Sequence, residues 1–202
     1  MALLDSIDSV AEVVEKLPIA GRAIIGITGP PGAGKSTIAA QLVERLPGAA
    51  LLPMDGFHLP QAELRRLGRR DRMGAPDTFD VDGFIALLST LRAGGPVIAP
   101  GFDREIEEPV PGALHIDAPI VVVEGNYLLL DSGGWERAAG LFDATFSVEV
   151  DDGIRLQRLI ARHERFGKSP ADARAWATGP DEANARIIAA TARLADHRIR
   201  LP

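Results

Sequence analysis

One short glycine-rich segment constrains the fold of this chain more than any other feature. Residues 29–36 read Gly-Pro-Pro-Gly-Ala-Gly-Lys-Ser, which matches the phosphate-binding pattern G-x-x-x-x-G-K-[ST], and they follow the apolar run 23–27. Glycines let successive backbone N–H groups converge on phosphate oxygens, while the lysine supplies positive charge and the hydroxyl can ligate magnesium at a helix N-terminus. We therefore predict a strand, loop and helix that bind a nucleoside triphosphate through Gly29, Gly32, Ala33, Gly34, Lys35, Ser36 and Thr37.

Length and composition limit the remaining possibilities. With 202 residues, of which 46% are hydrophobic and 25% charged, the chain is expected to form a single soluble α/β domain over 1–202. Its net charge of −6 disfavours a nucleic-acid partner held by general attraction, and the absence of cysteine excludes disulfides and thiolate chemistry. No apolar run approaches the roughly 20 residues that span a bilayer, so we expect no membrane association and a cytoplasmic location.

Short apolar runs alternate with helical stretches, which is typical of βαβ units. The runs 23–28, 49–54, 120–123 and 144–150 predict strands, 96–99 predicts a short strand, and 101–117 predicts a hairpin or an excursion over the surface. Helices are predicted over 3–17, 35–46, 61–67, 81–91, 151–166, 171–177 and 181–194. The pattern predicts a three-layer αβα fold with a mostly parallel sheet. The N-terminal helix, within 1–18, is expected to pack on its own domain rather than on a second subunit.

Two carboxylates stand where predicted strands end. Asp55 follows the run 49–54, and Glu124 follows the four β-branched residues 120–123. In open α/β sheets ligands bind outside the carboxyl ends of the strands, so both side chains are expected beside the phosphate loop. The chain contains neither an N-K-x-D motif nor an L-S-G-G-Q motif, which disfavours a GTPase and a transporter ATPase.

Four segments in order carry a resemblance to a known family: Met-Asp-Gly-Phe-His at 54–58, Arg-Met-Gly-Ala-Pro-Asp-Thr-Phe-Asp at 72–80, Pro-Gly-Phe-Asp-Arg at 100–104 and Val-Glu-Gly-Asn-Tyr at 123–127. The chain resembles the phosphoribulokinase, uridine kinase and bacterial pantothenate kinase group, and within it a bacterial subgroup labelled fructose transport system kinase. The resemblance runs from residue 23 onward. It implies a P-loop NTPase fold with a helical lid over 155–180, and it implies ATP and Mg²⁺ as cofactors.

The resemblance also implies residue roles on the donor side. Asp55 matches the catalytic base, which acts with Lys35, and Glu124 and Ser36 would hold magnesium. In the predicted lid helix, four arginines are spaced 3, 4 and 3 apart and share one face: Arg155, Arg158, Arg162 and Arg165. We assign Arg162 to catalysis and Arg158 to ATP binding, and expect two of the four arginines to form a solvated face.

On the acceptor side, the resemblance implies contacts from His58, Arg72, Phe79, Arg104 and Asn184. Arg104 stands where pantothenate kinases have a histidine, and their longer substrate-side segments are shortened here. A cationic side chain favours a phosphorylated or carboxylated acceptor. The alternative for Arg104 is a surface pair with Glu105, Glu107 or Glu108.

We therefore expect an ATP-dependent kinase that phosphorylates an alcohol group of a small metabolite: a sugar, a sugar acid or a sugar phosphate. Two alternatives stay open, a nucleoside or pantothenate-type kinase and a non-catalytic ATP-binding regulatory protein. The expected partner is the small-molecule acceptor, with neither nucleic acid nor membrane. The sequence leaves open a homodimer and the choice between ATP and GTP as the donor.

Overall fold

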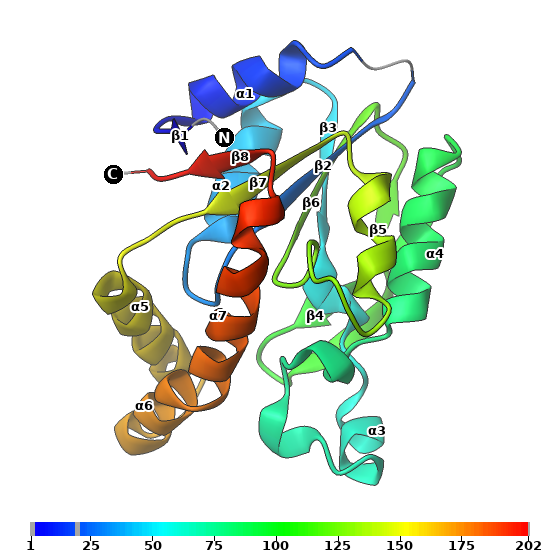
Figure 1. The fold of residues 1–202 in the computed structure, drawn as a ribbon. Coiled ribbons are helices and arrows are strands. Elements are labelled where there is room, and N and C mark those ends of the chain that lie inside the picture. The colour runs from blue at the N-terminus through cyan, green and yellow to red at the C-terminus, as the bar shows by residue number, and fades with distance from the viewer. Residues whose placement is uncertain (1–2, 19–20, 202) are drawn as a thin grey trace.

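The computed structural model describes residues 3–18 and 21–201, and its centre is a six-stranded parallel sheet with the order β1-β8-β7-β2-β6-β3 (Figure 1). The strands are β1 (Leu3–Leu4), β2 (Ala23–Thr28), β3 (Ala49–Pro53), β6 (Ile120–Gly125), β7 (Ala144–Val148) and β8 (His197–Ile199). Every residue of β2 and β7 is buried, because helices cover both faces of the sheet. The predicted αβα fold is confirmed.

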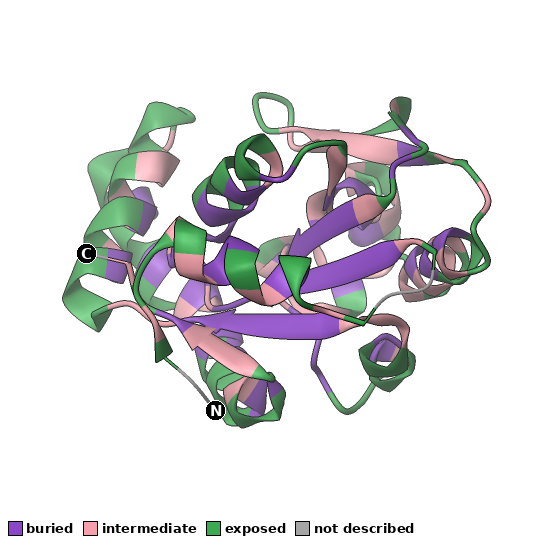
Figure 2. Cartoon of the chain, turned by 90° about the horizontal axis from the view of Figure 1, so that it is seen from above, coloured by how far each residue is buried: buried purple, intermediate pink, exposed green. Residues whose placement is uncertain are grey.

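Helices form the two outer layers (Figure 2). On one face, α1 (Ile7–Glu15) and α2 (Lys35–Arg45) bury an apolar stripe against the sheet. On the other face, α4 (Val81–Arg92) and α7 (Pro180–Thr191) contribute to a second cluster, which also holds Trp135 and Ala138. Each layer presents its exposed residues outward, as expected for amphipathic helices.

The N-terminal segment differs from its prediction. We predicted a helix over 3–17, but Leu3–Leu4 pairs with β8 and the helix starts at Ile7. Residues 1–2 of the N-terminal segment 1–18 lie outside the described residues. Ser6 sets this boundary because its side chain accepts a hydrogen bond from the N–H of Ser9, at 3.2 Å, as an N-cap. The apolar face of α1 packs on its own domain, as expected.

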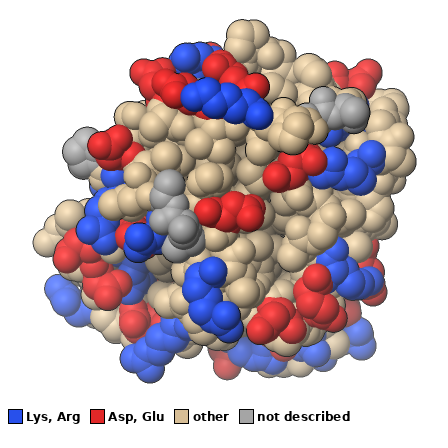
Figure 3. Space-filling model, turned by 45° about the horizontal axis from the view of Figure 1, so that its top comes forward, with Lys and Arg blue, Asp and Glu red and all other residues tan. Residues whose placement is uncertain are grey.

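The surface around α1 carries charges of both signs. Arg45 of α2 pairs with Asp8 and Glu15 of α1, at 2.7 and 3.4 Å. On the face in Figure 3, acidic and basic side chains are interspersed, and among the described residues there neither sign forms an extended patch. Binding of nucleic-acid phosphates requires a basic surface, which this face does not offer.

The remaining elements lie around the carboxyl ends of the strands (Figure 1). β4 (Val97–Asp103) and β5 (Glu108–Ile116) form a two-stranded antiparallel sheet. The strand predicted over 96–99 is the start of β4, so the hairpin predicted within 101–117 instead joins that strand to β5. The short α3 (Gln61–Arg66) lies on the same side, while α5 (Asp152–Arg165) and α6 (Pro170–Thr178) project beyond the sheet opposite it. Within the described ranges, we find no helix both long and apolar enough to cross a membrane.

The turn that carries Asp55 is pressed against β4 at Gly56. A Cβ at Gly56 would lie 2.1 Å from the carbonyl oxygen of Pro100, a backbone atom that cannot rotate away. We predict that Gly56→Ala destabilises the protein by about 1–3 kcal/mol or more, as overpacking of a close contact does. Thermal unfolding should show a fall in Tm of several degrees, roughly 3–10 °C for a chain of this size.

Gly140→Ala is the matched control, since a Cβ there would meet nothing within 4 Å. Equal melting temperatures for the two variants would contradict the close approach of the Asp55 turn to β4.

Candidate active site

The phosphate loop joins β2 to α2 in a conformation that its glycines permit. Gly32 and Gly34 have φ of 81° and 93°, in the left-handed region, and α2 begins directly after Gly34 at Lys35. A Cβ on Gly32 would also lie 2.7 Å from the backbone oxygen of Arg155, so the loop packs against α5. The first turn of α2 therefore presents its N–H groups at the carboxyl end of the sheet, where an anion is favoured.

Lys35 is buried in the cleft next to this loop. Its Nζ donates a hydrogen bond to the carbonyl oxygen of Pro30, at 3.2 Å. Burial lowers the pKa of Lys35 to about 8, although Glu124 and Asp55 attract the charged form. The lysine is thus a desolvated cation close to two carboxylates, a group that an incoming phosphate would stabilise.

Ser36 and Glu124 lie together at the level of the loop. The Ser36 hydroxyl donates to Glu124 Oε1 at 3.1 Å, and strand register places Glu124 beside Ile27 of β2 and Pro53 of β3. Burial raises the pKa of Glu124, and the nearby charge of Asp55 adds to this effect. Two oxygen donors fit Mg²⁺, which retains waters and takes further oxygens from phosphates rather than needing an all-protein cage.

Asp55 lines the same cleft and forms an ion pair. Arg104 Nη2 donates to Asp55 Oδ2 at 2.5 Å, so Arg104 does not form the surface pair with Glu105, Glu107 or Glu108 considered as its alternative. Burial raises the pKa of Asp55, but the Arg104 guanidinium, with Lys35, outweighs burial and holds that pKa below its ordinary value. Asp55 is therefore an ionised carboxylate that can accept a proton.

His58 is held between aromatic rings beside Asp55. Its ring centroid lies 4.0 Å from that of Phe79 and 4.7 Å from that of Phe102. Burial lowers the pKa of His58, so the ring is neutral near pH 7. Its Nδ1 lies 2.8 Å from the backbone oxygen of Asp55, which can only accept, and this contact assigns the proton to Nδ1. The ring fixes the Asp55 turn and closes one wall of the cleft.

The arginines of α5 divide into two groups. Arg158, Arg162 and Arg165 line a cavity of about 540 Å³ above the phosphate loop, with Arg162 also reaching the cleft of Asp55. Arg155 is instead buried, and it bonds to Asp152 at 3.0 Å and to Glu182 of α7 at 2.5 Å. We expected a solvated role for two of the four arginines, whereas Arg155 joins α5 to α7.

The cleft is about 130 Å³ in volume, and its far wall comes from the lid helices. His163 Nε2 and Asp181 Oδ2 are 2.7 Å apart, and Asn184 is buried next to them on α7. Asn184 is thus in the cleft, as predicted, together with Phe79. The pair of His163 with Asp181 gives this wall hydrogen-bonding groups that suit hydroxyls.

The structure does not bring Arg72 to this cleft, although the resemblance placed it at the acceptor. Its guanidinium bonds both oxygens of Asp77, at 2.6 and 2.8 Å, and it is not among the residues that line the cleft of Asp55. Sequence reasoning did not select several residues that do line the cleft: Phe102, Glu107, His163, Trp176 and Asp181. Two of them had a local signal, since Phe102 lies within the motif 100–104 and His163 is next to Arg162.

A phosphate loop, an ionised carboxylate and residues of α5, α6 and α7 lie around one cleft, and the chain was compared with known proteins. The phosphoribulokinase / uridine kinase family model matches residues 24–169. The uncharacterized protein YggC of Escherichia coli is 36% identical over 183 residues, covering 87% of this chain and 76% of that protein. The "putative uridine kinase C227.14" of Schizosaccharomyces pombe is 35% identical over 164 residues, and the alignment covers 74% of this chain and 70% of that protein.

Among solved structures, the "putative fructose transport system kinase" from Silicibacter sp. TM1040 superposes with a TM-score of 0.88. It is 36% identical, and the alignment covers 96% of this chain and 98% of that one. This agreement extends over the lid helices as well as the sheet, and it includes the subgroup that the sequence motifs suggested. The chain belongs to the phosphoribulokinase / uridine kinase family of P-loop kinases.

Proposed function

We propose that this protein transfers the γ-phosphoryl group of ATP to a hydroxyl of a compact, polyhydroxylated metabolite: a sugar, sugar acid or sugar phosphate. The observation that carries the proposal is the placement of Asp55 in one cleft with Lys35, Ser36, Glu124 and Arg104. A carboxylate base beside a triphosphate loop is what a kinase needs, because positioning and charge neutralisation account for most of phosphoryl transfer.

The donor side holds the nucleotide. The N–H groups at the start of α2 and Lys35 would bind the β- and γ-phosphates, and Ser36 with Glu124 would hold Mg²⁺, which neutralises phosphate charge. Next to the loop, a further cavity of about 670 Å³ lies between Thr37 of α2, Val148 at the end of β7 and Arg158. This cavity is large enough for a purine base, so the nucleotide would extend from it to Lys35.

The transfer step uses Asp55 and the cationic groups around it. Asp55 accepts the proton of the acceptor hydroxyl while the hydroxyl oxygen forms a bond to the γ-phosphorus. The bond between that phosphorus and the oxygen that bridges it to the β-phosphate breaks, and ADP leaves. Lys35 and Arg162 offset the charge on the transferring group. Arg162 has its pKa lowered by burial and by Arg104, yet an arginine remains charged at any working pH.

The acceptor side favours a small molecule with an anionic group. The cleft volume of about 130 Å³ is below the roughly 300–1,000 Å³ of sites for drug-sized ligands, so it suits a compact acceptor better than a nucleoside. Arg104 and Arg162 supply positive charge next to Asp55, while His163, Asp181 and Asn184 offer partners for hydroxyls. This combination supports a sugar acid or sugar phosphate. The name of the S. pombe relative is the main support for the nucleoside alternative.

The experiment that tests the proposal is ADP release with Mg-ATP and a panel of sugars, sugar acids, sugar phosphates, uridine and pantothenate. We expect an anionic sugar derivative to raise turnover at least about tenfold over the acceptor-free rate, and its uncharged analogue to be the poorer acceptor by a similar factor. In Arg104→Gln, the ratio of turnover with the anionic derivative to turnover with its uncharged analogue should be smaller than in the wild type. Failure of every compound, or a best rate with uridine or pantothenate, would overturn this acceptor assignment.

The depressed pKa of Lys35 predicts proton uptake on nucleotide binding. With a pKa of about 8 in the free protein, half of the Lys35 side chains are neutral at pH 8, and a bound triphosphate favours the charged form. We expect about half a proton to be taken up per ATP at pH 8, and close to none from this lysine near pH 6.5, where it is already charged. Calorimetry in two buffers of different ionisation enthalpy measures the uptake.

Lys35→Arg is the control, because its guanidinium stays charged throughout this range. Uptake at pH 8 that persists unchanged in this variant would refute the assignment to Lys35.

A further inference from the structure

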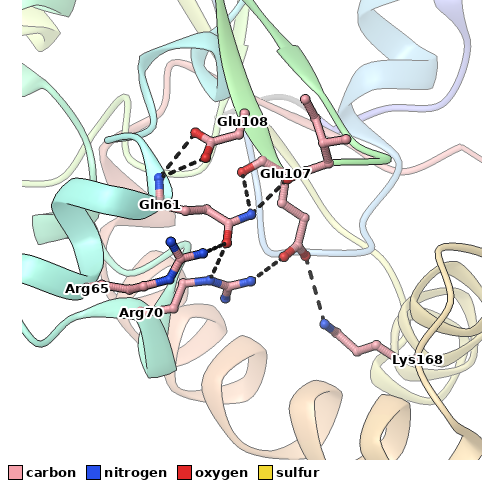
Figure 4. A network of polar contacts seen from close by, with 7 residues as sticks. Gln61, Arg65, Arg70, Glu107, Glu108 and Lys168 are labelled. Atoms are coloured by element: carbon pink, nitrogen blue, oxygen red, sulfur yellow. Dashed lines mark hydrogen bonds and ion pairs between the residues drawn. The ribbon is translucent and has the colours of Figure 1, made fainter.

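Glu107 bridges the two sides of the candidate active site. It lies at the turn between β4 and β5 and lines the cleft. Its Oε2 accepts a hydrogen bond from Arg70 at 2.5 Å, and its Oε1 lies 3.9 Å from Lys168 Nζ (Figure 4). Arg70 belongs to the segment that follows α3, whereas Lys168 belongs to the turn between α5 and α6. One carboxylate thus connects the acceptor side of the cleft to the lid.

The turn around Glu107 is held in an uncommon conformation. Glu107 has a φ of 53°, the single positive φ of a non-glycine residue in the described ranges. Gln61 at the start of α3 fixes the turn: its side-chain nitrogen donates to the backbone oxygens of Ile106 and Glu107, at 2.8 and 3.3 Å. Its N–H donates to the Glu108 carboxylate at 3.2 Å. Such a conformation persists where the surroundings determine it, which is frequent at functional sites.

The contact with the lid is weaker than the contact with Arg70. Lys168 and Glu107 are 3.9 Å apart, and their side chains are 23% and 38% exposed. An ion pair of this length and exposure is weak, so it can open and re-form. Lys168 Nζ also lies 4.8 Å from the ring centroid of Trp176, which lines the cleft from α6. Release of Lys168 would therefore alter the environment of Trp176.

We propose that Glu107 is a positioning residue that latches the lid, formed by α5 and α6, to the acceptor side of the cleft through Lys168. The bond to Arg70 holds the carboxylate in place, and the pair with Lys168 selects the closed arrangement of the lid. In that arrangement Arg162 and His163, which are on α5, face Asp55 and Arg104 across the cleft. Any effect of this latch on turnover rests on the proposed function, whereas the contact between Glu107 and the lid does not.

The tryptophans allow the latch to be tested without an acceptor. Trp135 is fully buried and bonds to the backbone oxygen of Pro76, at 3.1 Å, while Trp176 is partly exposed. Acrylamide therefore quenches Trp176 selectively. We expect Glu107→Gln, measured with the full chain and Mg-AMP-PNP, to raise the quenching constant about twofold or more, as an opened lid exposes Trp176. The matched control is Glu105→Gln, an exposed carboxylate two residues away on the same turn.

Lys168→Met provides a second variant that leaves the bond of Glu107 to Arg70 intact. It should raise the quenching constant as well, and the double variant Glu107→Gln/Lys168→Met should add little to either change. Constants for both single variants within error of the wild type would overturn the latch, even if the kinase activity is confirmed. With an active acceptor, Glu107→Gln should raise the acceptor KM severalfold and leave the ATP KM within about twofold.

Discussion

Asp55→Asn should lower the acceptor-dependent kcat by about 100-fold or more, with ATP binding nearly unchanged. The carboxylate lines the cleft next to Lys35 and is paired with Arg104, and loss of a general base costs about 10²–10⁴ in rate. Asparagine keeps the size of the side chain and a partner for Arg104 but cannot accept the proton. The measurement is steady-state ADP release at saturating acceptor, together with the ATP Kd from calorimetry.

The matched control for this variant is Asp77→Asn, which neutralises another partly exposed carboxylate paired with arginine, outside the cleft. It should retain turnover within a few fold. An Asp55→Asn enzyme with similar retention would show that Asp55 has a structural role only, and the ATP-binding regulatory alternative would then be preferred.

Lys35→Met should reduce kcat/KM for ATP by about 10²–10³, because it removes a preorganised cation aimed at the transferring phosphate. The same change removes a buried charge and leaves an apolar side chain of similar length. The depressed pKa shows that the folded protein disfavours that charge, so the melting temperature should not fall. Loss of activity with unchanged or higher Tm separates a functional effect from unfolding.

Lys16→Met is the control for Lys35→Met, because Lys16 is an exposed lysine at the C-terminal end of α1 and pairs only with Glu12 among described residues. Its activity should match the wild type. A Lys35→Met enzyme that keeps activity within a few fold would contradict the position of the triphosphate.

The elements that carry the nucleotide site were predictable because each has a local signal. The phosphate loop has a fixed spacing, and the parallel arrangement of β3 and β6 puts Asp55 and Glu124 at one edge once their strands are recognised. The two short strands β1 and β8, at one end of the sheet, gave no such signal. Leu3–Leu4 and His197–Ile199 are too short to show a period, and they form strands only because they pair with each other and with β7.

The acceptor side depends on contacts between distant segments, which a single sequence does not reveal. His163 and Asp181 meet because α5 packs beside α7, and Glu107 reaches Lys168 across the cleft. Arg72 shows the opposite case. The motif around it is present, yet a neighbouring carboxylate, Asp77, engages its guanidinium. Residue type and order therefore predicted which residues gather at the carboxyl edge of the sheet, but not the contacts between distant segments.

The most direct measurement follows the phosphoryl group itself. Wild-type protein with Mg²⁺ and ATP labelled at the γ-phosphate is incubated with the best anionic sugar derivative of the panel, and the label is located by chromatography. With the wild type, we expect labelled, phosphorylated acceptor in an amount equal to the ADP formed. With Asp55→Asn, we expect almost no labelled acceptor. Label released as inorganic phosphate, or transfer that Asp55→Asn supports as well as the wild type, would contradict it.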